Sequence, residues 1–165
     1  MAVRPILVFP DPQLERKAET VTEFDERLKQ LADDLLDTMR AAPGVGITAP
    51  HIGVLQRLTV IELDRSVPAM ILVNPEIVDA SAEQSTHDEG SVSMPGAIAP
   101  VMRPKAIRVR YQTLTGDVME EDVDGFLATC IQHEVDQLDG IFWLKRLSKL
   151  KRDRLVKKWT KDRAR

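Results

Sequence analysis

Intervals of three and four residues between apolar positions predict three helices. The first follows a helix-start signal at residues 22–25, ends before Pro43-Gly44, and has the apolar positions Leu28, Leu31, Leu35 and Met39. The second is expected over residues 125–138, because Asp139-Gly140 marks its end. The third is expected to begin at Ser148 and has sparse apolar positions, at Leu150, Leu155 and Trp159.

Short apolar runs rich in β-branched residues predict strands in the middle of the chain. Residues 58–63 and 70–73 form two such runs. Asn74-Pro75 is expected to interrupt the second, which can resume over residues 76–78. Residues 105–114 alternate between apolar and polar positions, turn at 115–117 and return through 118–123, which is typical of a β-hairpin. Strands in the middle and helices at the edges predict an α+β fold.

Length and composition narrow the class of protein. With 165 residues, 43% hydrophobic and 30% charged, the chain is expected to form one globular domain over residues 1–165. No apolar run approaches the roughly 20 residues that a membrane helix needs, so no membrane partner is expected. The N-terminal segment lacks a signal-peptide pattern, and the single cysteine, Cys130, excludes an internal disulfide and is expected in a buried helix. These features favour a location in the cytoplasm.

The net charge of −3 conceals a strong asymmetry along the chain. Residues 145–165 contain 11 basic and 2 acidic side chains, so the last predicted helix is basic and the rest of the chain is acidic. A basic helix of this kind favours contact with a polyanion such as RNA. The alternative is a solvated helix face that is attracted to the acidic remainder of the chain.

Residues 133–137 read H-E-V-D-Q, which is the layout of the metal-binding motif H-E-x-x-H with glutamine in the last position. In the intact motif, two imidazoles one helical turn apart bind a divalent metal, and the glutamate acts as general base on a metal-bound water. Taken alone, His133 is more simply explained as an ordinary helix histidine with satisfied hydrogen bonds. The adjacent Glu134 and two further motifs favour a former metal ligand.

Three segments occur in a fixed order: G-V-G-I-T-A-P-H at 44–51, E-G-S-V-S at 89–93 and Q-H-E-V-D-Q at 132–137. Together they resemble the peptide deformylase motifs G-x-G-L-A-A-x-Q, E-G-C-L-S and Q-H-E-x-D-H. Peptide deformylases remove the formyl group from the N-terminal methionine of new bacterial proteins. The resemblance covers essentially the whole chain. It implies a fold in which β-strands surround a central motif-bearing helix, with N- and C-terminal helices.

Three departures from these motifs fall at positions that bind the metal or take part in catalysis in the family. The resemblance places the metal ligands at His133, Ser91 and Gln137, so a hydroxyl replaces a thiolate and an amide replaces an imidazole. Both are poor ligands for iron, zinc or nickel, the metals of the family. We therefore expect no metal, or a weakly bound divalent ion. His51 replaces the glutamine that holds the developing oxyanion, and is expected either to donate to an oxyanion or to hold a metal together with His133.

Other catalytic positions are retained. The resemblance assigns Glu134 as general acid/base and the Val92 backbone N–H as an oxyanion donor, and Gly46 keeps the backbone turn of the first motif. Ser91 is most simply a small polar replacement for cysteine. The alternative is a serine nucleophile with His133 and Glu134 beside it.

The resemblance therefore implies a deformylase-like protein with little or no deformylase activity, whose pocket still accepts formyl-methionyl peptide N-termini. The alternative is an active hydrolase of formyl or other N-acyl substrates that uses Glu134 and a modified metal site. Because the basic C-terminal helix is associated in the family with docking near the ribosomal exit, the ribosome is an expected partner.

Among the remaining residues, His87 is expected in a surface loop, and Met94, Met102 and Met119 in the core.

Overall fold

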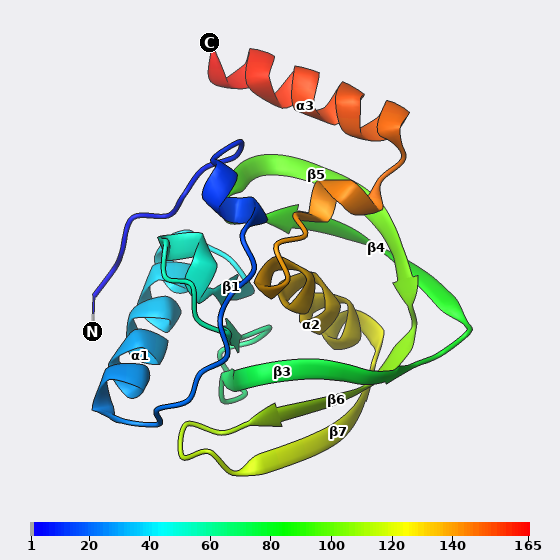
Figure 1. Cartoon of the computed structure of the whole chain (residues 1–165). Helices are drawn as coiled ribbons and strands as arrows, with labels where there is room; N and C mark the ends of the chain where they lie inside the picture. The colour runs from blue at the N-terminus through cyan, green and yellow to red at the C-terminus, as the bar shows by residue number, and fades with distance from the viewer. Residues whose placement is uncertain (1) are drawn as a thin grey trace.

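The protein is described by a computed structural model that covers residues 2–165; Met1, the first residue of the expected domain, lies outside them. Three α-helices and two antiparallel sheets make up the fold (Figure 1). The helices are α1 (Glu26–Ala41), α2 (Gly125–Leu138) and α3 (Lys149–Arg163). Three short 3₁₀ helices connect other elements: η1 (Pro12–Glu15), η2 (Ala49–Ile52) and η3 (Trp143–Arg146).

The larger sheet has five strands in the order β1-β2-β3-β6-β7, and the smaller sheet pairs β4 with β5. The strands of the larger sheet are β1 (Gly46–Thr48), β2 (Leu58–Ile61), β3 (Met70–Ala80), β6 (Ala106–Gln112) and β7 (Val118–Asp124). The smaller sheet contains β4 (Gln84–Ser91) and β5 (Met94–Pro104). All pairings between these strands are antiparallel, and the predicted hairpin is confirmed as β6 and β7.

Helix α2 lies at the centre, with the larger sheet on one side and the β4–β5 sheet on the other (Figure 1). Every residue from Ala128 to Leu138 is buried, including polar and charged ones. The polar groups of a helix that is covered on all sides must find partners inside the protein. The expected central motif-bearing helix is thus confirmed.

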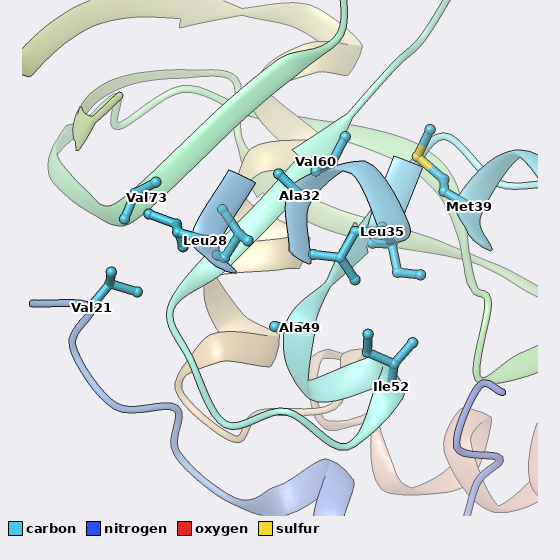
Figure 2. Close-up of a cluster of buried hydrophobic side chains, with 11 residues drawn as sticks. Val21, Leu28, Ala32, Leu35, Met39, Ala49, Ile52, Val60 and Val73 are labelled. Carbon is cyan, nitrogen blue, oxygen red and sulfur yellow. The ribbon is translucent and has the colours of Figure 1, made fainter. Parts of the chain in front are cut away.

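Helix α1 packs its predicted apolar stripe against β1, β2 and η2 (Figure 2). Leu28, Leu35 and Met39 are buried in this cluster, and Ala49 and Val60 lie on the opposite side of the interface. The helix begins at Glu26, at the end of the predicted start signal, because the Asp25 side chain accepts a hydrogen bond from Leu28 N at 3.1 Å. This packing fixes the segment from β1 to η2, which carries the first sequence motif.

The predicted interruption at Asn74-Pro75 is an irregularity in the pairing rather than an end of the strand, since the register of β3 against β6 shifts between Val73 and Glu76. Strand β3 continues from Met70 to Ala80, with register shifts in its pairing with β6. Asn74 adopts a left-handed φ of 50°, which asparagine tolerates better than most residues. Its side chain bonds the backbone N–H and C=O of Val21, so the turn-forming residue is stabilised within the strand.

Predictions for individual residues had mixed outcomes. Met94 and Cys130 are buried as expected. Met102 and Met119 are 65% and 40% exposed, so their placement in the core was wrong, since both lie on strand faces that no other layer covers. His87 lies in β4 rather than in a loop, and its Nδ1 is 3.0 Å from the Thr129 hydroxyl. Within residues 2–165, no helix has the length and apolar character that a membrane span requires.

Candidate functional site

A cavity of about 430 Å³ opens between β1, α2 and the β4–β5 sheet. Residues 42–46, 88–92 and 95–98 form its walls, together with side chains from α2. All three sequence motifs contribute to it, through Gly46, His51, Ser91, Val92, His133 and Glu134. Gln137, the remaining predicted site residue, does not line the cavity. The fold therefore brings together six of the seven positions that the sequence predicted.

His133 is held in place by a buried chain of charges. Its Nδ1 lies 2.8 Å from Glu89 Oε1, and the Glu89 carboxylate accepts two hydrogen bonds from Arg103, of 2.6 and 2.9 Å. Burial lowers the pKa of His133, but the hydrogen bond to Glu89 and the charge of Glu134 outweigh it and raise the pKa above 6.5. The contact of Nδ1 with Glu89 orients the ring. Nε2 then faces Glu134 and lies 3.7 Å from Glu134 Oε1.

Glu134 is a buried carboxyl group with an unpaired oxygen. Its Oε2 has no hydrogen-bond partner among residues 2–165. Burial raises the pKa of Glu134 to about 7. Gly46 makes room for this side chain, because a Cβ at that position would lie 3.2 Å from Glu134 Oε1. A carboxyl group with this pKa can accept or donate a proton near neutral pH.

His51 is a neutral donor at the wall of the cavity. The backbone N–H of Thr48 donates to His51 Nδ1 at 2.9 Å, so Nδ1 is an acceptor and the proton of the neutral ring lies on Nε2. Burial, assisted by the charge of His133, lowers the pKa of His51 to about 3. His51 Nε2 is buried and, among the described residues, has no partner. It can therefore donate to an oxygen atom of a bound molecule.

The other two positions predicted as metal ligands have hydrogen-bond partners of their own. Ser91 Oγ accepts a hydrogen bond from Ser93 N at 3.1 Å. The Gln137 side-chain amide is buried and donates to the backbone oxygen of Leu14 at 2.7 Å. In the part of the chain that the structure describes, no three His, Cys, Asp or Glu side chains are grouped so as to hold a metal ion.

Comparison with known proteins identifies the family of this chain. Residues 3–153 match the model of a family described as polypeptide deformylase. The chain belongs to the polypeptide deformylase family. It is 60% identical to a peptide deformylase-like protein of Brucella melitensis over 98% of each chain. It is 42% identical to a peptide deformylase of Erythrobacter litoralis, over 99% of this chain and 98% of that one.

The deformylase fold is confirmed by a solved structure. The crystal structure of a peptide deformylase from Legionella pneumophila superimposes with a TM-score of 0.92, at 39% identity, over 99% of this chain and 96% of that chain. Family membership thus extends over the helices, both sheets and all three motifs. It includes the segments that carry Ser91 and Gln137.

Sequence reasoning missed the ion network that supports the deformylase helix. Arg103 bonds Asp136 at 2.8 Å as well as Glu89, and Arg146 forms two further hydrogen bonds to Asp136, of 2.8 and 2.7 Å. The partners come from β4, β5, α2 and η3, so no local pattern connects them. One signal in the sequence could have predicted this network. Glu89 and Asp136 lie inside two of the motifs, and a carboxylate in a buried motif needs a positively charged partner.

Proposed function

We propose that this chain is a cytoplasmic deformylase-like protein with a degenerate metal centre and little or no deformylase activity. The observation that carries the proposal is the Gln137 side chain, which is buried and bonded to Leu14 O instead of lining the cavity. Family enzymes depend on a divalent metal. By resemblance, its ligands correspond to His133, Ser91 and Gln137.

These three side chains do not fit iron, zinc or nickel. Late transition ions favour thiolate and imidazole, whereas a hydroxyl and a carboxamide are weak donors to them. Zinc binding in small structural sites is worth roughly 10–16 kcal/mol, and thiolates and imidazoles carry most of it. With His133 as the remaining strong ligand, several kcal/mol of that free energy are lost. The donor set therefore supports weak metal binding or none.

The cavity keeps features that suit a peptide N-terminus. Apolar groups of Val92, Ile98 and Phe126 line it and are appropriate neighbours for a methionine side chain. His51 Nε2–H and the Val92 backbone N–H can donate to a formyl oxygen. Without a metal, Glu134 can activate only ordinary water, so hydrolysis of a formamide is expected to be slow. We infer that formyl-methionyl N-termini are bound rather than processed.

A second candidate function is supported by Glu134 itself. Its pKa of about 7 matches the requirement for a general acid/base at neutral pH. In this alternative the protein hydrolyses formyl peptides or another N-acyl substrate, with a modified metal site that includes His51, His133 and Ser91.

Metal analysis and a peptide assay distinguish the two functions. Protein purified without chelators is expected to contain well below one equivalent of iron, nickel or zinc. It is expected to release formate from formyl-Met-Ala-Ser at a rate near that of an Ala variant of Glu134, and to bind the same peptide in calorimetry. Stoichiometric metal together with turnover that the Glu134→Ala variant loses would establish the second function instead.

We also propose that helix α3 docks on a polyanion, with the ribosome as the partner. Residues 145–165 have 11 basic and 2 acidic side chains, and Lys157, Lys158 and Lys161 are exposed on α3. The helix lies at the outside of the molecule, so its basic surface is free for a large partner (Figure 1). Phosphate contacts of this kind weaken as the salt concentration rises.

Co-sedimentation with ribosomes across a salt series tests this partner. The protein is expected to pellet with ribosomes at low salt and to be released as salt rises. Replacement of Lys157, Lys158 and Lys161 by Glu is expected to abolish pelleting, whereas replacement of the exposed acidic residues Glu23 and Glu26 by Gln is not. Pelleting that the triple replacement does not change excludes α3 as the docking surface.

A further inference from the structure

One wall of the cavity is a bulge in strand β5. In the β4–β5 pairing, Glu89 lies opposite Ala99 and Ser91 lies opposite Met94. Residues 95–98 therefore lie opposite Gly90 alone and leave the regular ladder. The same four residues line the cavity. Bulges of this kind redirect a strand, and the backbone groups that they release from the ladder need other partners.

Helix α3 supplies a partner on the outer side of the bulge. The indole Nε1–H of Trp159 donates to the backbone oxygen of Pro95 at 2.8 Å. Trp159 is 7% exposed and is the one buried residue of α3. Its ring lies 5.9 Å from that of Phe9 and belongs to the apolar cluster that contains Met94 and Ala97. The single buried side chain of the helix is thus bonded to the cavity wall.

Gly90 fixes the inner side of the same bulge. A Cβ on Gly90 would lie 2.9 Å from the backbone oxygen of Ala97, which is too close for any other residue. The absence of this atom allows residues 95–98 to approach β4. The wall is held between Gly90 on one side and Trp159 on the other. A larger residue in place of Gly90 would clash with the wall. The Trp159 contact is made by a side chain, so a smaller side chain removes it without a steric clash.

We propose that Trp159 is a positioning residue for the ligand cavity, although it does not line the cavity. Through its hydrogen bond to Pro95, α3 sets the position of residues 95–98 and therefore the width of the space beside Val92 and Phe126. This inference rests on the proposed function, because it takes a peptide N-terminus as the ligand. It makes the C-terminal helix part of the binding site.

The test compares Trp159→Phe with the wild-type chain. Phenylalanine keeps an aromatic ring in the cluster and removes the N–H donor. Loss of one neutral hydrogen bond is a modest change, so the affinity for formyl-Met-Ala-Ser in calorimetry is expected to fall roughly two- to ten-fold. Amide hydrogen exchange at residues 96–98 is expected to accelerate, with no change in α1. Leu155→Ala is the matched control: Leu155 packs on the same cluster from the same helix but has no bond to the wall.

The control is expected to lower the melting temperature without changing the peptide affinity or the exchange of residues 96–98. Unchanged exchange at these residues in Trp159→Phe would overturn the inference, whether or not the peptide binds. Faster exchange with unchanged affinity would overturn it too, because the wall would then not affect the ligand. If the wild-type chain binds no peptide, the proposed function fails, and the exchange experiment still decides whether Trp159 holds the wall.

Discussion

Gln137 on α2 and Leu14 in η1 are joined by a hydrogen bond of 2.7 Å, from the side-chain amide to the backbone oxygen, across 123 residues of sequence. Both residues are buried. A buried backbone carbonyl needs a partner, and here the partner is a residue that the sequence resemblance predicted as a metal ligand. Gln137 therefore ties the N-terminal segment to the central helix.

Replacement of Gln137 by Ala is expected to destabilise the protein. The change leaves the Leu14 carbonyl buried without a partner, which costs about 1–3 kcal/mol of unfolding free energy. Urea unfolding followed by circular dichroism measures the difference. Gln84→Ala, at an exposed position of β4, is the control and is expected to change the stability by no more than about 0.5 kcal/mol. Equal stability of the Gln137→Ala and wild-type proteins would show that the bond is dispensable.

Replacement of Arg103 by Met is expected to have a larger effect. Arg103 is 4% exposed and bonds the carboxylates of both Glu89 and Asp136. Its removal leaves buried negative charge without its main partner, which costs about 3–5 kcal/mol. Arg108→Met is the matched control, because Arg108 also pairs with two carboxylates, Glu120 and Asp122, but on an exposed strand face. It should lose at most about 1 kcal/mol in the same unfolding experiment.

Local signals predicted the elements that form within short stretches of sequence. The apolar stripe of α1, the Asp25 cap and the β6–β7 hairpin depend on neighbours within a few residues, and all three are present. Strands β4 and β5 gave no such signal. Their residues include His87, Asp88 and three prolines, and parts of both strands line the cavity. Family resemblance, not periodicity, predicted that they belong to a deformylase fold.

The candidate site was predictable in its residues but not in its hydrogen bonds. Motif positions placed His51, Ser91 and His133 near one another, and the structure places all three at one cavity. The bond from Gln137 to Leu14 and the bond from Arg103 to Glu89 join elements that are distant in sequence. Such partners depend on the tertiary fold, so a single sequence without the fold does not reveal them.

Acid is expected to weaken the interaction between α1 and Glu62, the residue that follows β2. Glu62 accepts hydrogen bonds of 2.9 and 2.6 Å from Arg40, and this interaction holds the pKa of Glu62 below its usual 4.5. The ionised carboxylate therefore stabilises the folded state above pH 4.5, and this stability is lost as the pH falls through the lowered pKa.

The prediction is measured as the difference in unfolding free energy between wild type and Glu62→Gln. This difference is expected to be largest near pH 7 and to shrink as the pH falls from 5 toward 2. A difference that stays constant, or that grows as the pH falls, would contradict the assignment of Arg40 as the group that stabilises the carboxylate.

The single cysteine is expected to be unreactive in the folded protein. Burial, followed by the charge of Glu134, raises the pKa of Cys130 to about 12 from an ordinary 9.0. The fraction of thiolate at pH 8 is then about a thousand-fold lower than for a free thiol. Ellman's reagent is expected to react with one thiol per chain in guanidinium chloride and very slowly without it. Rapid native reaction would show that the α2 side of the cavity opens to solvent.

The double replacement Ser91→Cys and Gln137→His is expected to restore a metal centre. With His133 it recreates a thiolate and two imidazoles, a ligand set that binds zinc or nickel with one position open. The metal-free variant should be less stable than wild type, because the bond to Leu14 O is lost. Added zinc should then raise its melting temperature, because the ion binds the folded state, with about one ion retained after dialysis. Each single replacement, as the control, should retain less. A double variant that retains no metal would show that the motif backbone, and not only its ligands, has diverged.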